Sequence, residues 1–375
     1  MQTAGRVSVS KQVLILGGYG NFGKLISIAL AKAHIPIIIS GRHANRAEQL
    51  ASEISAAYAG AQVEAASFDV AAELDANLKK YHPAVVINTC GPFQTADYSV
   101  AQACIRNQSH YIDLADAREF VNGITSLNTP AKANDVIVIS GASTVPGLSS
   151  AVMEKYKDRF KVIESLTYGI SPGAKAPRGL ATTQGILTYL GKPLKPVRGQ
   201  THPRYGWQDL YRQNYPQLGK RWMANIDIPD LDIFPEKYGI QSIRFSAGME
   251  SSILHLSMWA LSWLVRLGLP INLSAHARGL LSLSSAFDWT GTADGGMHMI
   301  IKGKTPQGED LILQWFLIAK NADGPQIPCV PAILLTKKIL AGELRSSGAY
   351  TCTGWITLDE CLRELKDFSI REYVY

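Results

Sequence analysis

Residues 13–32, VLILGGYGNFGKLISIALAK, limit the possible folds of this chain more than any other stretch. Four apolar residues, Val13 to Leu16, are typical of a fully buried strand, and a glycine cluster ends that run abruptly. From Phe22 onward the apolar residues recur at helical spacing, with no proline before Pro36, so a helix is predicted directly after the glycines. The chain therefore opens with a strand, a tight turn and a helix.

The glycines of this turn fit two spacings. Gly18, Gly20 and Gly23 match G-x-G-x-x-G, while Gly17, Gly20 and Gly23 match the looser G-x-x-G-x-x-G, and the sequence leaves both open. Glycine permits a tight turn and lets the backbone approach a pyrophosphate, which the free N–H groups of the helix then bind. The whole turn is predicted to bind a dinucleotide, through Gly17, Gly18, Tyr19, Gly20, Asn21, Phe22 and Gly23.

The next predicted strand, residues 36–40, ends about 20 residues after the glycines, where NAD-selective domains place a carboxylate against the ribose 2′-hydroxyl. Here the chain has Ser40-Gly41-Arg42 instead. Ser40 offers a hydroxyl, Arg42 offers a planar cation suited to phosphate, and Arg46 follows one helical turn later. These residues predict NADP(H) as the cofactor. The alternative is that both arginines merely begin a solvated helix.

Composition sets wider bounds. A chain of 375 residues with 46% hydrophobic residues can bury a large core and predicts two domains. No C-x-x-C spacing occurs, so we expect no metal site and no disulfide framework, and the absence of an export signal favours a cytoplasmic protein. The cysteines are Cys90, Cys104, Cys329, Cys352 and Cys361.

Strands and helices alternate along the first part of the chain. The pattern predicts a doubly wound parallel sheet, the Rossmann arrangement, in which ligands bind beyond the carboxyl ends of the strands. The predicted strands are 13–16, 36–40, 63–70, 84–93, 110–116 and 135–142, and the helices between them are 22–32, 45–58, 74–81 and 98–107. The strand ends that we expect at the cofactor are Asp69 with Val70, and Cys90, Gly91, Pro92 and Phe93.

Four motifs in this order carry a family resemblance: the glycine turn, SGRHANRAEQL, NTCGPF followed by YSVAQACIRNQSHYIDLAD, and ISGASTVPGLSSAVM. Over residues 13 to about 160 the chain resembles the saccharopine dehydrogenase-like family. The resemblance implies a Rossmann domain, a second α+β domain with a mixed sheet, and C-terminal helices that return to the first domain. We therefore predict domains at 1–160 with about 325–375, and at 161–324.

The resemblance also implies pyridine-nucleotide chemistry, usually hydride transfer at a carbon joined to nitrogen, although some relatives reduce carbon–carbon double bonds. The chain departs from the family at Ala115-Asp116-Ala117, where many members have a Gly-Glu pair, and it is unlike saccharopine-forming enzymes after Pro172. The substrate therefore cannot be carried over from the family.

Five residues are candidates for catalysis or substrate binding. Asp113 and Asp116 end the fifth strand, where a carboxylate could bind a substrate amine or relay a proton, although each could equally cap a turn. His298, in a hairpin predicted over 295–320, could donate a proton or be an ordinary sheet histidine. Lys175 and Arg178 could bind a carboxylate or phosphate. Cys90 is predicted to line the cofactor site, and Phe93 to shield the nicotinamide.

Two further stretches bear on partners. Residues 171–240 hold ten Lys and Arg against five Asp and Glu, which favours either an arm that attracts an anionic substrate or an insertion that grips a partner subunit in a homodimer. No nucleic-acid-binding motif accompanies them. Residues 253–271 are apolar, with Trp259 and Trp263 on one helical face. Burial in the core or in a dimer is expected there, in preference to a lipid interface.

Three functions remain open from the sequence. The first is an NADP(H)-dependent oxidoreductase that acts at an imine or secondary amine of an amino-acid-like or other anionic small molecule. The second is an enoyl reductase that acts on a lipid-like chain. The third is an NADP(H)-binding scaffold protein without turnover. Because no strong catalytic acid or base stands out, residue types alone do not choose among them.

Overall fold

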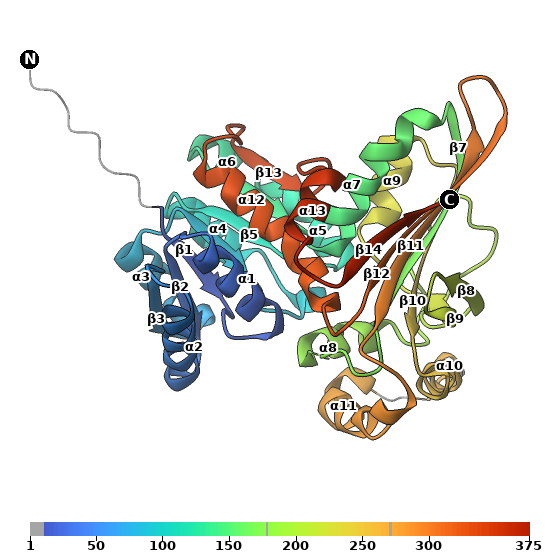
Figure 1. Ribbon diagram of the computed structural model, residues 1–375, viewed down its shortest axis with the longest axis horizontal. Coiled ribbons are helices and arrows are strands. Elements are labelled where there is room, and N and C mark those ends of the chain that lie inside the picture. The colour runs from blue at the N-terminus through green and yellow to red at the C-terminus, as the bar shows by residue number, and fades with distance from the viewer. Residues whose placement is uncertain (1–10, 178, 270–271) are drawn as a thin grey trace, which may run out of the picture.

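The computed structural model describes residues 11–177, 179–269 and 272–375, and two seven-stranded sheets organise them (Figure 1). Sheet A has the strand order β13-β6-β5-β4-β1-β2-β3, and all its pairings are parallel. Its strands are β1 (Val13–Leu16), β2 (Ile37–Gly41), β3 (Val63–Ser67), β4 (Val85–Asn88), β5 (His110–Asp113), β6 (Ile137–Ser140) and β13 (Gly348–Thr351). The predicted Rossmann sheet is confirmed.

Alternation of apolar residues explains why helices cover both faces of sheet A. In β1, Val13 and Ile15 pack on one side while Leu14 and Leu16 pack on the other, and all four are fully buried. The first face meets α1 (Asn21–Lys32), α2 (Ala44–Ala57) and α12 (Val330–Leu340), and the second meets α3 (Val70–Tyr81), α4 (Ser99–Arg106) and α6 (Asn128–Ala133).

Sheet B is mixed, with the order β14-β12-β11-β7-β10-β9-β8 and a parallel β7–β10 pair among antiparallel neighbours. Its strands are β7 (Val162–Ser171), β8 (Tyr211–Tyr215), β9 (Gly219–Asn225), β10 (Ser242–Met249), β11 (Gly295–Lys304), β12 (Asp310–Ala319) and β14 (Ile370–Val374). The hairpin predicted over 295–320 is β11 and β12. The two-domain α/β fold expected from the sequence is thus present.

The remaining helices join and flank the sheets. They are α5 (Arg118–Gly123), α7 (Ser149–Tyr156), α8 (Leu180–Tyr189), α9 (Asp230–Tyr238), α10 (Ser252–Arg266), α11 (Ala277–Ser285) and α13 (Leu358–Glu364). Short 3-10 segments lie at Phe93–Thr95, Ile124–Leu127, Lys157–Arg159, Leu273–His276, Asp288–Thr290 and Gly324–Cys329, and a π-type turn at Thr144–Leu148.

Several predicted strands end too late, since β4 ends at Asn88 and not at 93, and β5 ends at Asp113 and not at 116. The third strand ends at Ser67 rather than Val70, because Asp69 accepts a hydrogen bond from the N–H of Ala71 and so begins α3. The burial expected for residues 253–271 is found only in part of the described stretch, 253–269: Trp259 packs against the core, whereas Leu264 and Leu267 are 49% and 78% exposed.

The C-terminal segment serves both sheets. Helix α12 packs against β4 and β5, and β13 extends sheet A beside β6, but β14 pairs with β12 in sheet B. The domain bounds 1–160 with about 325–375, and 161–324, stay a prediction. Because β14 pairs with β12, that strand would belong to the second domain.

A buried arginine ties the two domains together. Arg118, the first residue of α5, is 1% exposed and donates to the carboxylates of Asp227 and Asp232 beside the second sheet. Its remaining N–H groups donate to the backbone carbonyls of Lys195 and Pro196. Every N–H donor of the guanidinium therefore has an acceptor. Because the guanidinium is buried, water could not replace an acceptor that is lost. The contact therefore fixes α5 against α9.

Replacing Arg118 tests its role. We expect Arg118→Lys to lower the free energy of unfolding by roughly 3 kcal/mol, because an ammonium keeps the charge but leaves buried carboxylate and carbonyl oxygens unpaired. Urea unfolding measures the loss. The matched control is Lys195→Ala, since the exposed Lys195 ammonium contacts the same Asp232 carboxylate at 3.4 Å; its effect should stay below about 1 kcal/mol. Equal effects of the two changes would contradict the assigned role of Arg118.

Candidate functional site

The glycine turn adopts the wider of the two spacings. Gly17 has a φ of +73°, and a Cβ there would lie 2.7 Å from Thr89 Oγ1, so both conformation and space demand glycine. A Cβ on Gly23 would lie 2.2 Å from the carbonyl oxygen of Gly17. Gly17, Gly20 and Gly23 are therefore the positions for the turn, the approach to the ligand and the helix–strand contact.

The N-terminus of α1 is suited to an anion. Its N-cap residue, Gly20, makes no side-chain capping bond, and the first turn contains no acidic residue. A Cβ on Gly20 would meet only the carbonyl oxygen of Gly17, at 3.1 Å, so space is open beside the first N–H groups of the helix. These features fit the pyrophosphate of a dinucleotide.

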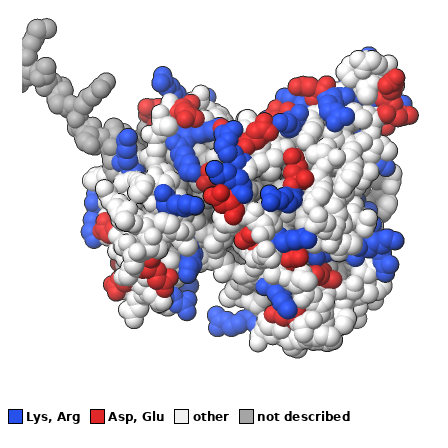
Figure 2. Space-filling model, in the orientation of Figure 1, with Lys and Arg blue, Asp and Glu red and all other residues white. Residues whose placement is uncertain are grey.

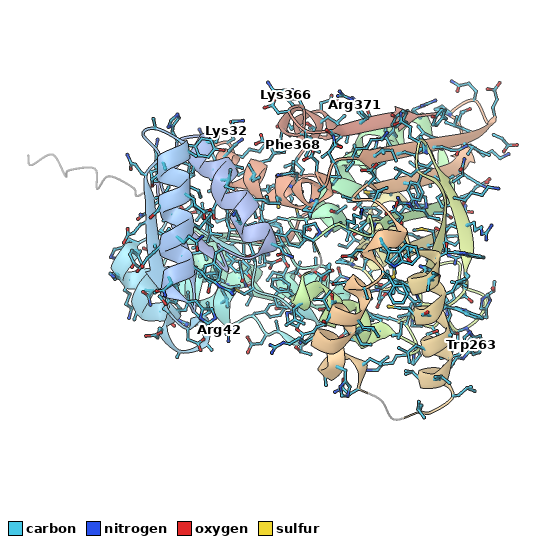
Figure 3. The ribbon with its side chains drawn as sticks, turned by 60° about the horizontal axis from the view of Figure 1, so that its bottom comes forward. Lys32, Arg42, Trp263, Lys366, Phe368 and Arg371 are labelled. Carbon is cyan, nitrogen blue, oxygen red and sulfur yellow. The ribbon has the colours of Figure 1, made fainter. Side chains whose placement is uncertain are left out.

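Arg42 and Arg46 are exposed just beyond β2, and Figure 3 places Arg42 at the surface of the first domain. Among the described residues, neither arginine side chain has a hydrogen bond or ion pair, so both can bind a ligand phosphate. Tyr19 completes this end of the site, since its ring lies against Gly41 and its hydroxyl accepts from the N–H of His43 at 3.0 Å. The predicted Arg42 and Arg46 thus flank the glycine turn.

The side chain of Ser40 does not point toward the predicted cofactor site. It is fully buried, and its hydroxyl donates to the carbonyl oxygen of Ile15 at 3.0 Å. The hydroxyl therefore stabilises the β1–β2 pair and does not face the ribose. Asp69 is exposed at the end of β3, where its carboxylate caps α3, and Val70 follows it as the first residue of that helix. Both lie beyond Arg42 along the sheet, toward its β3 edge.

The segment after β4 forms a wall of the crevice above the strand ends. Cys90 is exposed, but neighbouring atoms keep enough water away to raise the pKa of its thiol to about 11, despite the charge of Arg42. A thiol that stays protonated fits a wall residue rather than a nucleophile. Gly91 and Pro92 are half-buried, whereas Phe93 packs on Phe120 with ring centroids 5.3 Å apart. Phe93 is therefore a core residue, and the expectation that it shields a nicotinamide is wrong.

The two aspartates after β5 have different surroundings. Asp113 is fully buried and accepts from the Ser140 hydroxyl and from the N–H groups of Ala115 and Gly141. Burial raises the pKa of Asp113 to about 6. Since it cannot reach a ligand, Asp113 is a structural residue that joins β5 to β6.

Asp116, by contrast, is exposed, and its carboxylate accepts from the Gln94 amide at 3.1 Å. Protein surrounds the carboxylate closely enough that loss of water raises its pKa above the usual value. The hydroxyl of Tyr189, at the end of α8, interacts with Gln94 and with the charge of Asp116. The sequence analysis missed Gln94 and Tyr189; Gln94 directly follows the GPF turn, but nothing in the sequence pointed to Tyr189.

Helix α8 of the second domain faces the strand ends of the first. A Cβ on Gly91 would lie 3.5 Å from Ala181, and one on Gly185 would lie 2.9 Å from Gln94. Gly179, which precedes α8, approaches the amide of Asn21 in the glycine turn. The crevice therefore lies between the carboxyl ends of sheet A and α8, and Figure 2 shows an indentation of the surface between the two domains.

Most of the basic residues in 171–240 are held by partners elsewhere. Arg221 pairs with Glu250, Arg204 donates to Asn225, and Lys237 pairs with Glu154. Lys175 is exposed in the loop that leads to α8, whereas Arg178 lies outside the described residues. Among the described residues of the predicted cationic arm, Lys175, Lys192 and Lys220 remain exposed without a side-chain partner, and Lys175 is the one in the loop before α8.

His298 is enclosed within sheet B. It is fully buried, its ring nitrogens lie 2.8 and 3.3 Å from the hydroxyls of Tyr215 and Tyr211, and burial lowers its pKa to about 3. The imidazole is therefore neutral at physiological pH and has no contact with solvent. Proton donation by His298 to a substrate in the crevice is excluded by this burial, and its role is that of an ordinary sheet histidine.

No group of His, Cys, Asp or Glu in the described part of the chain is arranged to hold a metal ion. The described helices also include none with the length and apolarity needed to cross a bilayer.

Comparisons with known proteins agree with this geometry. Residues 13–139 match the family model of the saccharopine dehydrogenase NADP binding domain. The fold is similar to apo saccharopine dehydrogenase (L-Glu forming) from Saccharomyces cerevisiae, at 14% identity and a TM-score of 0.66, covering 97% of this chain and 100% of that one. An amine dehydrogenase from Mycobacterium smegmatis shows 12% identity and a TM-score of 0.48, covering 94% and 96%. A comparison with curated protein sequences gave no match.

The glycine turn, the open helix terminus and the family match together define an NADP-dependent oxidoreductase with a Rossmann domain. Residues 13–139 match the saccharopine dehydrogenase NADP binding domain, as the motifs implied, and the whole chain shares the fold of saccharopine dehydrogenase.

Arg42 provides the sharpest test of cofactor recognition. We expect Arg42→Ala to raise the Kd for NADPH about 10- to 100-fold and to leave the Kd for NADH unchanged, because only NADPH carries the 2′-phosphate that the guanidinium binds. Titration calorimetry measures both constants. Lys79→Ala is the control, since it removes the same charge from an exposed residue in the last turn of α3. A variant that binds NADPH as tightly as the wild type does would refute the assignment.

Proposed function

We propose that the protein transfers a hydride between NADP(H) and a carbon–nitrogen centre of a small amino-acid-like molecule. The observation that carries this proposal is the Asp116 carboxylate, which lies with Gln94 and Tyr189 between the end of β5 and α8. In a doubly wound sheet the reacting end of the dinucleotide lies beyond these strand ends. A negative charge at this place selects for a substrate that is positive.

The charge of Asp116 distinguishes two kinds of reduction. A protonated imine carries a positive charge that a nearby carboxylate stabilises, and the same carboxylate can hold the ammonium or secondary amine of the product. Reduction of an enoyl group instead builds negative charge on a carbonyl oxygen, which a carboxylate would oppose. The exposed Asp116 therefore supports chemistry at nitrogen.

The reaction needs little further catalysis from the protein. When bound at the glycine turn, NADPH would supply the hydride for the imine carbon, and NADP⁺ would accept it in the reverse direction. Gln94 holds the Asp116 carboxylate through its amide, and Tyr189 closes the site from α8. Since a protonated imine is already electrophilic, orientation of the substrate can supply much of the rate.

The other end of the substrate is proposed to be anionic. Lys175 lies in the loop before α8, and no side-chain partner for it appears among the described residues. A carboxylate bound there and a nitrogen held by Asp116 would orient an amino acid or keto acid adduct across the crevice. All five cysteines are free thiols, as in proteins of a reducing compartment, which supports the cytoplasm as the proposed location.

A second candidate is reduction of an activated double bond in a lipid-like substrate. It is favoured by the apolar side chains exposed on α10, such as Leu264, in the same domain as α8. Assays of NADPH oxidation separate the candidates. Turnover with mixtures of α-keto acids and amines supports the first, and turnover only with unsaturated acyl compounds supports the second. Tight NADPH binding without any turnover would leave a scaffold protein.

Asp116→Asn tests the proposed role of the carboxylate. We expect kcat/KM for reductive amination to fall about 100- to 1,000-fold with little change in the Kd for NADPH, because the amide keeps the shape but not the charge. The control is Glu119→Gln, which removes the same charge from an exposed residue in the first turn of α5. Unchanged kcat/KM in Asp116→Asn would overturn the proposal.

The pH dependence gives a second readout of the same variant. Wild-type kcat/KM should fall as the pH drops through the pKa of Asp116, because protonation removes the negative charge that binds the substrate cation. Since the pKa of Asp116 is raised, this acid limb lies above the range of an ordinary aspartate. The limb should vanish in Asp116→Asn, and its persistence there would assign it to another group.

A further inference from the structure

Helix α10 exposes an apolar stripe along its whole length. The exposed positions follow helical spacing of three and four residues, so they lie on one face. Among its large side chains, Ile253 is 52%, Leu256 36%, Trp263 38% and Leu264 49% exposed, and Leu267, just after the helix, is 78% exposed. Ala260 continues the stripe between them. Figure 3 shows Trp263 on the outer side of the helix, away from the body of the protein.

The face of α10 that meets the protein contains both polar and apolar residues. His255 and Ser262 are fully buried. The Trp207 indole donates to the carbonyl oxygen of His255, and the Gln208 amide donates to the Ser262 hydroxyl. An ordinary surface helix buries its apolar side and exposes its polar side. On α10 the apolar residues Met258, Trp259, Leu261 and Val265 do pack against the core, so the exposed stripe is a second apolar face of the same helix.

The exposed apolar surface continues beyond α10. Leu269 is 45% exposed after the helix, and Leu283 of α11 is 63% exposed. Figure 1 shows α10 and α11 together at one end of the molecule, below sheet B, and the surface at that end in Figure 2 has few charged side chains. We call the exposed apolar residues Ile253, Leu256, Ala260, Trp263, Leu264, Leu267, Leu269 and Leu283 the apolar end.

The segment that forms the apolar end has only positive charges between Glu250 and Asp288. Residues 251–287 contain no Asp or Glu, although the chain has 31 of them, and they include Arg266 and Arg278. The Arg266 guanidinium stacks on Tyr205, 3.8 Å from the ring centroid, and lies 4.8 Å from that of Trp263. Arg278 is exposed. An apolar surface that has a tryptophan and two arginines, and no acidic residue within its own segment, matches the boundary between acyl chains and anionic headgroups.

We propose that the apolar end docks the protein on the surface of an anionic lipid membrane, with α10 lying in the plane of the interface. The large side chains of α10 would enter the acyl boundary while Arg266 and Arg278 meet lipid phosphates. The charge pattern favours lipid over a second copy of the chain, because the rim of a protein interface usually carries both signs of charge.

This docking would bring the crevice close to the lipid. Helix α11 packs on α8, and the Ser274 hydroxyl just before α11 donates to the carbonyl oxygen of Gln184 in α8. The same α8 forms the wall of the crevice opposite the strand ends. The docking proposal does not depend on the imine chemistry, since it concerns a surface outside the crevice.

Sedimentation with vesicles tests the docking of the full chain. Vesicles of phosphatidylcholine with phosphatidylglycerol should sediment the protein, and the partition should weaken about tenfold or more with phosphatidylcholine alone. The double variant Leu264→Glu/Leu267→Glu should lose sedimentation with both kinds of vesicle. The matched control is Ile312→Glu/Val374→Glu, which places the same charges at exposed apolar positions of β12 and β14 and should bind vesicles as the wild type does.

The Kd for NADPH is measured on every variant, and an unchanged value shows that the variant is folded. This control does not depend on the proposed reaction. Failure of the folded wild-type protein to sediment with either vesicle would overturn the proposal. A second result would also overturn it: the wild type forms a dimer in analytical ultracentrifugation without lipid, Leu264→Glu/Leu267→Glu dissociates that dimer, and the wild type does not bind vesicles. The apolar end would then be an interface between two copies of the chain. Equal loss of vesicle binding in both double variants would also refute it.

Discussion

The close approach of α1 to β1 is the constraint on which the rest of the site depends. With Gly17 in a left-handed conformation and no side chain on Gly23, the helix begins against the carbonyl of Gly17 and its first N–H groups point past the end of the sheet. Strand pairing then places the ends of β2 and β4 on either side of β1. The positions of Arg42 and of the crevice wall beside β1 therefore follow from one turn.

The second domain supplies the other wall of the crevice above sheet A. Arg118 holds α5 against α9, and α8 reaches back to the strand ends with Tyr189 facing Gln94 and Asp116. Because these contacts come from different domains, the geometry of the crevice depends on how the domains are docked. The buried Arg118 guanidinium is thus needed for the geometry of the crevice as well as for the stability of the fold.

The first domain was predictable from the sequence because its signals are local. The apolar runs, the glycine turn and the missing carboxylate before Arg42 all lie within short segments, and they sufficed to predict the parallel sheet and the NADP(H) cofactor, although not which glycine spacing applies. Ser40 was misplaced because chain order does not show which way a strand side chain points; it pairs with Leu16 and turns inward to the carbonyl of Ile15. Phe93 was misplaced for a similar reason, since its neighbour Phe120 is distant in sequence.

The second domain was less predictable because long-range partners decide its surface. The basic residues of 171–240 suggested a cationic arm, yet Arg221 and Lys237 are held by Glu250 and Glu154. Periodicity identified the apolar face of α10 but could not say whether that face meets the protein. In the structure Trp259 and Leu261 pack against the core, while Leu264 stays exposed.

A crystal structure of the protein with NADP⁺ bound tests the central claim most directly. The account predicts the 2′-phosphate on Arg42, the pyrophosphate at the N-terminus of α1, and the nicotinamide C4 facing the space between Asp116 and Tyr189. A nucleotide bound elsewhere, or a nicotinamide turned away from Asp116, would contradict it.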